Sequence, residues 1–174
     1  MHHSSLKTLV LAALCLALCL VLPFLTGQIQ QIGQALAPMH LPVLLCGFLC
    51  GPIYAMCVGA AAPLLRFALF GMPVLFPTGI AMCFELLTYG LTVGVLDKRL
   101  PQKPWAVYVT LLCAMLLGRI VWGSVRLILS GVSGSAFTWS MFLGGAVLNA
   151  VPGIIVQIVL VPVLVLALRK AKIA

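Results

Sequence analysis

Clusters of basic residues close three long apolar stretches of this 174-residue chain. The chain is 64% hydrophobic, and its two acidic side chains are Glu85 and Asp97. Seven of its ten basic residues fall at three places: the front (Lys7), the middle (Lys98, Arg99 and Lys103) and the end (Arg169, Lys170 and Lys172). A soluble protein of this length cannot bury so much apolar surface in its core. The sequence therefore predicts an integral membrane protein.

The length of the apolar stretches predicts how many times the chain crosses the membrane. A helical span needs about 20 apolar residues, so the chain has room for six spans, some of them shortened. We expect an all-α bundle of six transmembrane helices forming a single domain, residues 1–174. The expected spans are residues 6–25, 39–50, 53–70, 78–96, 105–129 and 137–168, the last interrupted near Pro152.

The basic clusters also predict the topology. Four expected spans separate Lys7 from the Lys98 cluster, and two separate that cluster from Arg169. All three clusters therefore lie on one side, which the positive-inside rule assigns to the cytoplasm. We expect a multi-pass protein of the cell membrane with both termini cytoplasmic (N-in, C-in). The net charge of +8 then reflects anchoring in the lipid bilayer, and no basic stripe with interleaved aromatics indicates a nucleic-acid partner.

Besides Lys7 at the start of the first span, four charged residues lie inside the expected spans: Arg66, Glu85, Arg119 and Arg126. A charge at mid-membrane costs roughly 2.5–3.5 kcal/mol on insertion scales, so each must face protein or water. The expected topology places all four in the outer half of the membrane. It also places His40 at the outer face, where the second span opens. This distribution predicts a pocket that opens to the outside.

The spacing of neighbouring residues refines the expected pocket. Arg119, Trp122 and Arg126 share one helix face, and Glu85 and Tyr89 are one turn apart. An aromatic ring beside a cation and an amide can stack on a flat ligand and bond its edge. Trp139 begins the last expected span, and Asn149 and Gln157 lie on it. The candidate substrate-binding residues are Arg119, Glu85, Trp122, Asn149, Tyr89, Arg66, His40, Arg126 and Trp139.

Several of these residues also have a purely structural interpretation. Arg126, Trp105 and Trp139 fit the role of interfacial anchors, and Glu85 fits that of a counter-charge for one arginine. Three arginines against one glutamate leave a positive surplus in the outer half, which favours a ligand with a carboxylate or other acidic group. That inference fails if Arg126 snorkels to the surface.

Groups for catalysis and metal binding are scarce. The sequence has no Ser/His pair with a carboxylate, no His-Glu-x-x-His motif and no glycine-rich phosphate loop. The seven cysteines lie in apolar runs, and the pairs Cys15/Cys19 and Cys46/Cys50 have no adjacent histidine or carboxylate, as expected of small hydrophobic side chains. We therefore expect neither an enzyme nor a metal site or cofactor in this chain.

Pairs of small residues four positions apart indicate close helix contacts or arise by chance in Ala/Gly-rich helices. They are Ala13 and Ala17, Gly47 and Gly51, and Gly90 and Gly94.

The whole chain resembles the substrate-binding S component of an energy-coupling factor (ECF) vitamin transporter. The resemblance rests on the six-span layout, the Ala13-x-x-x-Ala17 pair and the stretch from His40 to Pro52. The segments Pro63 to Pro77 and Glu85 to Gly90 add to it. It covers about residues 6–170.

The resemblance implies a function and partners. S components bind one vitamin or related precursor in an outward pocket, which residues 28–38 would cap in this chain. Alanines matching Ala13 and Ala17 dock on a shared transmembrane coupling subunit, and two ATPase subunits use the ATP. The substrate stays open between pantothenate and a pyridoxine-like, hydroxymethylpyrimidine-like or queuine-like ring. The alternatives are a stand-alone secondary carrier or channel for a small organic solute, and a structural or assembly membrane protein.

Overall fold

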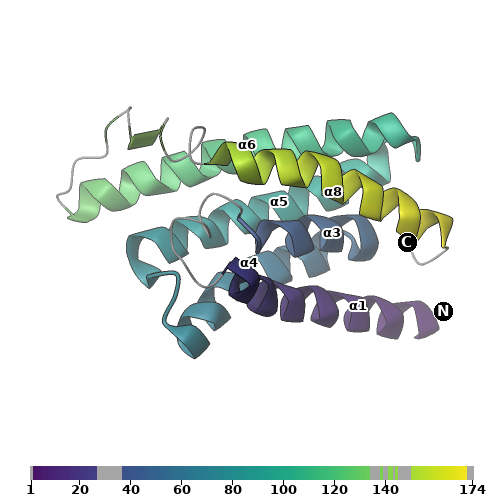
Figure 1. The fold of residues 1–174 in the computed structure, drawn as a ribbon, viewed down its shortest axis with the longest axis horizontal. Coiled ribbons are helices and arrows are strands. Elements are labelled where there is room, and N and C mark those ends of the chain that lie inside the picture. The colour runs from purple at the N-terminus through teal and green to yellow at the C-terminus, as the bar shows by residue number, and fades with distance from the viewer. Residues whose placement is uncertain are drawn as a thin grey trace.

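The computed structural model describes residues 2–26, 37–133, 138, 141–142, 144 and 150–171 of the chain, and the described segments are mainly helical (Figure 1). Helix α1 continues into a short turn, η1, and α5 is preceded by another, η2. In chain order the elements are α1 (His2–Val21), η1 (Leu22–Thr26), α3 (His40–Cys50), α4 (Pro52–Phe70), η2 (Leu75–Gly79), α5 (Ile80–Arg99), α6 (Pro104–Ser133) and α8 (Val151–Lys170).

Five of the described helical stretches are long and apolar enough to cross a membrane. They are Leu6–Phe24, Pro52–Phe70, Leu75–Arg99, Pro104–Val132 and Val151–Lys170. Helix α3 is apolar but has 11 residues, so it rises about 16 Å, roughly half the thickness of a hydrocarbon core. Helix α8 begins beside Pro152, where we expected an interruption, and most of 137–149 lies outside the described residues.

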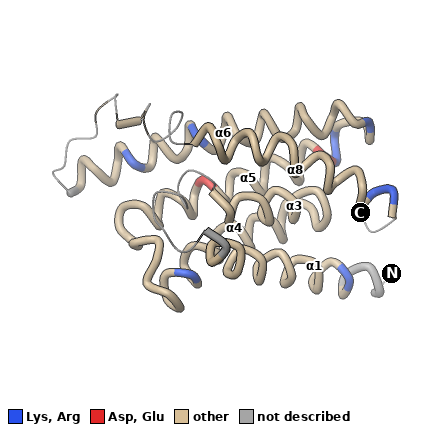
Figure 2. The backbone as a smooth tube through the Cα atoms, viewed as in Figure 1, with Lys and Arg blue, Asp and Glu red and all other residues tan. Residues whose placement is uncertain are grey.

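Both termini lie at the same end of the bundle, which we call the terminal end (Figure 1). Lys98 and Arg99 occupy the last turn of α5, and Arg169 occupies the last turn of α8. Arg169 forms an ion pair with Asp97, so the last turns of α5 and α8 meet at one level. Figure 2 shows basic residues gathered at this end, with single basic residues spread along the rest of the bundle.

Glycines allow α4 and α5 to pack with their backbones in close approach. A Cβ atom added at Gly90 would lie 2.5 Å from the carbonyl oxygen of Ala55, and one at Gly59 would lie 2.5 Å from that of Leu86. A Cβ at Gly94 would overlap the backbone of Pro52. The prediction that Gly90 and Gly94 mark a helix contact is therefore confirmed.

The short helix α3 lies at the centre of the bundle, where it packs against α1, α4, α5 and α8. Most of its residues are buried, from His40 at its first position to Phe48 near its end. Because α3 is about half a span long, its first residue lies inside the bundle. This position brings His40 against the middle of α5.

Candidate functional site

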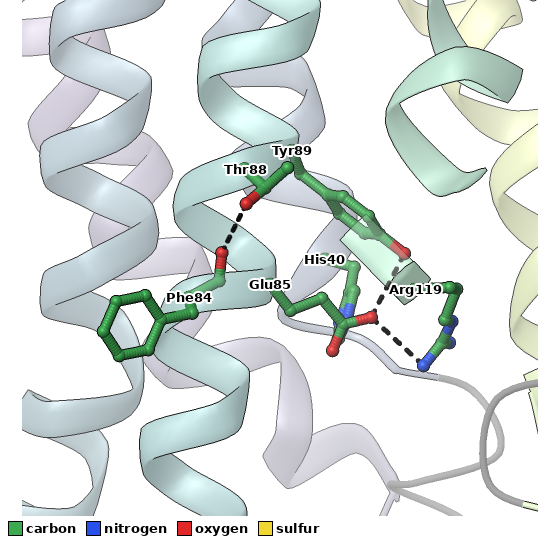
Figure 3. Close-up of polar contacts among 6 residues, drawn as sticks. All are labelled: His40, Phe84, Glu85, Thr88, Tyr89 and Arg119. Atoms are coloured by element: carbon green, nitrogen blue, oxygen red, sulfur yellow. Dashed lines mark hydrogen bonds and ion pairs between the residues drawn. The ribbon is translucent and has the colours of Figure 1, made fainter. Parts of the chain in front are cut away.

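Glu85 lies at the centre of the candidate site and is 1% exposed. The hydroxyl of Tyr89 donates a hydrogen bond to Glu85 Oε1 at 3.2 Å, and Arg119 Nη1 pairs with the same oxygen at 3.1 Å (Figure 3). His40 Nε2 also lies 3.4 Å from this oxygen, without hydrogen-bond geometry. Helices α3, α5 and α6 thus each bring a polar side chain to one carboxylate oxygen.

Local packing fixes the orientation of Tyr89. Tyr89 lies one turn after Glu85 on α5, which lets its hydroxyl return to the carboxylate. A Cβ atom at Gly118 of α6 would overlap the Tyr89 ring, so the absence of a side chain there makes room for it. The His40 ring stands edge-on to the Tyr89 ring with centroids 5.3 Å apart.

The position of His40 corrects the sequence-based expectation. We expected this residue at the outer face of the membrane, but it is 3% exposed and lies beside Glu85. The reason is that α3 is only 11 residues long and ends at Cys50 near the terminal end, so its first residue lies inside the bundle. A span-length helix would have carried its first residue to the opposite surface.

Glu85 and Arg119 form a pair of opposite charges with unequal exposure. The Glu85 side chain is 2% exposed and that of Arg119 is 18% exposed. A buried carboxylate needs a counter-charge and hydrogen bonds to offset its lost hydration, and here it has both. The pair is neutral in sum, so the surplus positive charge among the four embedded charged residues resides on Arg66 and Arg126.

Arg66 lies in a different part of the bundle from Glu85. Its Nη1 donates a 2.7 Å hydrogen bond to the carbonyl oxygen of Leu20, one of the last carbonyls of α1. Its guanidinium lies over the rings of Phe24 and Phe70, 5.3 Å and 5.4 Å from their centroids. These contacts satisfy a helix-end carbonyl and place Arg66 at the junction of α1 and α4.

Arg126 and Trp122 lie together farther along α6, as their spacing predicted. The Arg126 guanidinium is 5.6 Å from the Trp122 ring centroid and donates to Thr78 Oγ1 at 3.3 Å. Trp122 lies against Phe142, with centroids 6.4 Å apart. Arg126 lies seven positions after Arg119 on α6, a rise of about 10 Å. Arg126 and Trp122 therefore define a second level, farther from the terminal end than the Glu85 cluster.

Other expected site residues fall outside the described part of the chain: Asn149, Trp139 and the expected cap up to residue 36. Within the described part, no group of three His, Cys, Asp or Glu residues could hold a metal ion.

Gln157 lies on the last expected span and is not among the candidate substrate-binding residues, but the structure buries it. Gln157 is 2% exposed, and Val161 and Val165, one and two turns later, are also buried. A polar residue that opens such a buried stripe is the signal that could have added it to the list.

The length and apolar character of these helices, with a buried ion pair between them, define a polytopic helical membrane protein. The family model of the ECF transporter substrate-specific component matches residues 7–165, so the chain belongs to that family. No curated protein and no solved structure matches the chain.

Proposed function

We propose that this chain captures a small water-soluble vitamin or related precursor from outside the cell. It then delivers this substrate through a shared coupling subunit, which two ATPase subunits drive. The chain itself contributes binding and no chemistry, so ATP is used by the partners. Membership of the ECF substrate-specific family supports the role of a substrate-binding subunit.

The observation that carries this proposal is the polar cluster around Glu85. Ionisable residues inside membrane proteins are costly and usually face a substrate path or each other. Tyr89 and Arg119 bond Glu85 and His40 lies beside it, while the Arg119 side chain remains 18% exposed. A ligand that approaches Arg119 therefore meets a guanidinium whose position is already fixed by its ion pair with Glu85.

The proposed orientation follows from the basic clusters. With the terminal end in the cytoplasm, Asp97 lies near the inner surface and Glu85 lies twelve residues, about 18 Å, further out on α5. The Glu85 cluster is then more than halfway across the membrane from the inside. This depth suits a site that is filled from the outer surface.

The proposed docking face lies on α1. Ala13 and Ala17 are exposed in this chain, so no other described helix covers them. Small exposed residues one turn apart allow another helix to approach closely. The coupling subunit is the partner that we assign to this face.

Mass spectrometry of the detergent-purified protein tests the proposed function. We expect a small molecule to copurify, and Arg119→Ala and Glu85→Ala each to weaken its binding at least tenfold, about 1.4 kcal/mol. Unchanged affinity in both variants would remove the proposed site. A stand-alone carrier predicts uptake into vesicles without ATPase subunits, and an assembly protein predicts no bound small molecule.

A further inference from the structure

Gln157 carries a buried polar atom that has no hydrogen-bond partner among the residues that the structure describes. Its residue is 2% exposed, and its Oε1 has no hydrogen-bond partner within the described part of the chain. A buried amide oxygen without a partner costs free energy, and native proteins seldom retain one without a reason. The depth at which Gln157 lies in the bundle points to a reason for keeping this oxygen buried without a partner.

The ion pair between Asp97 and Arg169 sets the register between α5 and α8. Both helices end there, and both run in the same direction towards the terminal end. Counting back twelve residues from Asp97 gives Glu85, and counting back twelve from Arg169 gives Gln157. Each count is a rise of about 18 Å, so Gln157 lies at the depth of Glu85.

Each helix also carries a matching buried stripe between those two levels. Steps of four residues lead from Glu85 through Tyr89 and Val93 on α5, and from Gln157 through Val161 and Val165 on α8. All six residues are at most 2% exposed. The polar residue at the far end of each stripe therefore belongs to the core side of its helix.

Helices α3 and α6 connect the two stripes, because each of them packs against both α5 and α8. Figure 3 shows the pale yellow ribbon of α8 on the Arg119 side of the Glu85 cluster. Four helices thus bring one polar side chain each to a common depth: His40 from α3, Glu85 from α5, Arg119 from α6 and Gln157 from α8.

At this depth, the buried polar atoms without a partner in the described structure include both a donor and an acceptor. Arg119 Nε is a buried donor without a partner in the described structure, and Gln157 Oε1 is an acceptor without one. His40 Nδ1 also lacks a partner there. Since the Glu85–Arg119 pair is neutral in sum, this level suits an uncharged polar group that both accepts and donates hydrogen bonds.

We propose that Gln157 is a ligand-contacting residue that sets a donor requirement on the substrate. The substrate presents an N–H or O–H group to Gln157 Oε1 and an acceptor oxygen or nitrogen to Arg119 Nε. A lactam-like or hydroxyl-bearing heteroaromatic ring meets both conditions. This inference rests on the proposed function and deepens it by naming the chemistry of the bound group.

The test uses Gln157→Leu, which keeps the size of the side chain and removes its polar atoms. Its matched control is Thr110→Val, because Thr110 Oγ1 is also buried without a partner in the described structure but lies nine residues before Arg119 on α6. Thr110 is therefore about 14 Å below the cluster. Native mass spectrometry measures bound small molecule after purification and after incubation with pyridoxine, hydroxymethylpyrimidine, queuine or pantothenate.

We expect Gln157→Leu to retain less than a tenth of the bound molecule that wild type and Thr110→Val retain. Ligand-depleted Gln157→Leu should also unfold at the wild-type temperature or above it, because the variant no longer buries an unsatisfied oxygen. Normal retention by Gln157→Leu, or a lower unfolding temperature in the depleted state, overturns the assignment of Gln157. Wild type that binds none of the probes and carries no copurified molecule overturns the proposed function itself.

Discussion

Arg119 Nη1 lies 3.1 Å from Glu85 Oε1, and this ion pair joins α6 to α5 inside the bundle. The carboxylate is the more deeply buried partner: Tyr89 of α5 donates a hydrogen bond to it, and His40 of α3 lies 3.4 Å from it. The arginine is the more exposed partner. The pair therefore has a fixed acidic half and a basic half that can also serve a ligand.

This pairing predicts strong coupling between the two residues in stability. Removing either charge leaves the other buried without its counter-charge, whereas removing both leaves none. We expect a double-mutant cycle with Glu85→Ala and Arg119→Ala to give a coupling energy of about 0.5–3 kcal/mol in reversible unfolding. A control cycle with Asp97→Ala and Arg119→Ala should be additive within about 0.5 kcal/mol. Asp97 lies about 18 Å along α5 from Glu85, the residue with which Arg119 pairs. Additivity in the first cycle would contradict the pairing.

Gly118 predicts a second effect on the site. In Gly118→Ala the new Cβ would overlap the Tyr89 ring, so Tyr89 must move and its hydrogen bond to Glu85 is lost or weakened. We expect a loss of about 1–3 kcal/mol in stability and roughly tenfold weaker ligand binding. Calorimetry and a binding titration measure the two effects.

Gly131→Ala is the matched control, because Gly131 lies on the same helix with no atom of the described residues within 4 Å of an added Cβ. It should be neutral or slightly stabilising, as alanine favours a helix over glycine. Equal losses in both variants would show that the effect does not come from Tyr89.

The sequence predicted the main partners of this site but not their arrangement. Embedded charges and one-turn spacing identified Glu85, Tyr89 and Arg119, because charged residues in apolar helices must face the interior. The sequence placed the start of the short helix α3 within one residue of its observed position, but the depth of His40 depends on how this helix packs among four neighbouring helices. Such packing has no local pattern in the sequence.

The same limit applies to Arg66. Its charge and position suggested a ligand contact, but its partner in the structure is the carbonyl of Leu20, a residue 46 positions away. Every residue type has a backbone carbonyl, so the sequence does not mark the one at Leu20 as a partner of Arg66. The contact can be recognised only once α1 and α4 are seen to meet in the structure. Gly90 and Gly94 show the opposite case, since their spacing alone indicated a helix contact.

Arg66 should therefore act on stability more than on ligand binding. Arg66→Met keeps an apolar stem beside Phe24 and Phe70 but removes the hydrogen bond and the cation–π contacts. We expect a loss of about 1–3 kcal/mol in the free energy of unfolding and less than threefold weaker ligand binding. Arg99→Met, at an exposed position, is the control and should leave both nearly unchanged. Binding that falls as far as in Arg119→Ala would return Arg66 to the ligand site.

Ala13 and Ala17 predict the separation of binding from transport. Both are exposed on α1, and bulky side chains there would hold a partner helix away while leaving the Glu85 cluster intact. We expect Ala13→Trp combined with Ala17→Trp to abolish uptake in cells that express the coupling subunit and ATPases, with ligand affinity unchanged in the purified chain. The control is Leu112→Trp combined with Leu116→Trp, which has the same spacing and exposure on α6 and should retain uptake. Intact uptake in the α1 variant would reject α1 as the docking face, and equal loss in the control would point to a general effect of tryptophan on insertion.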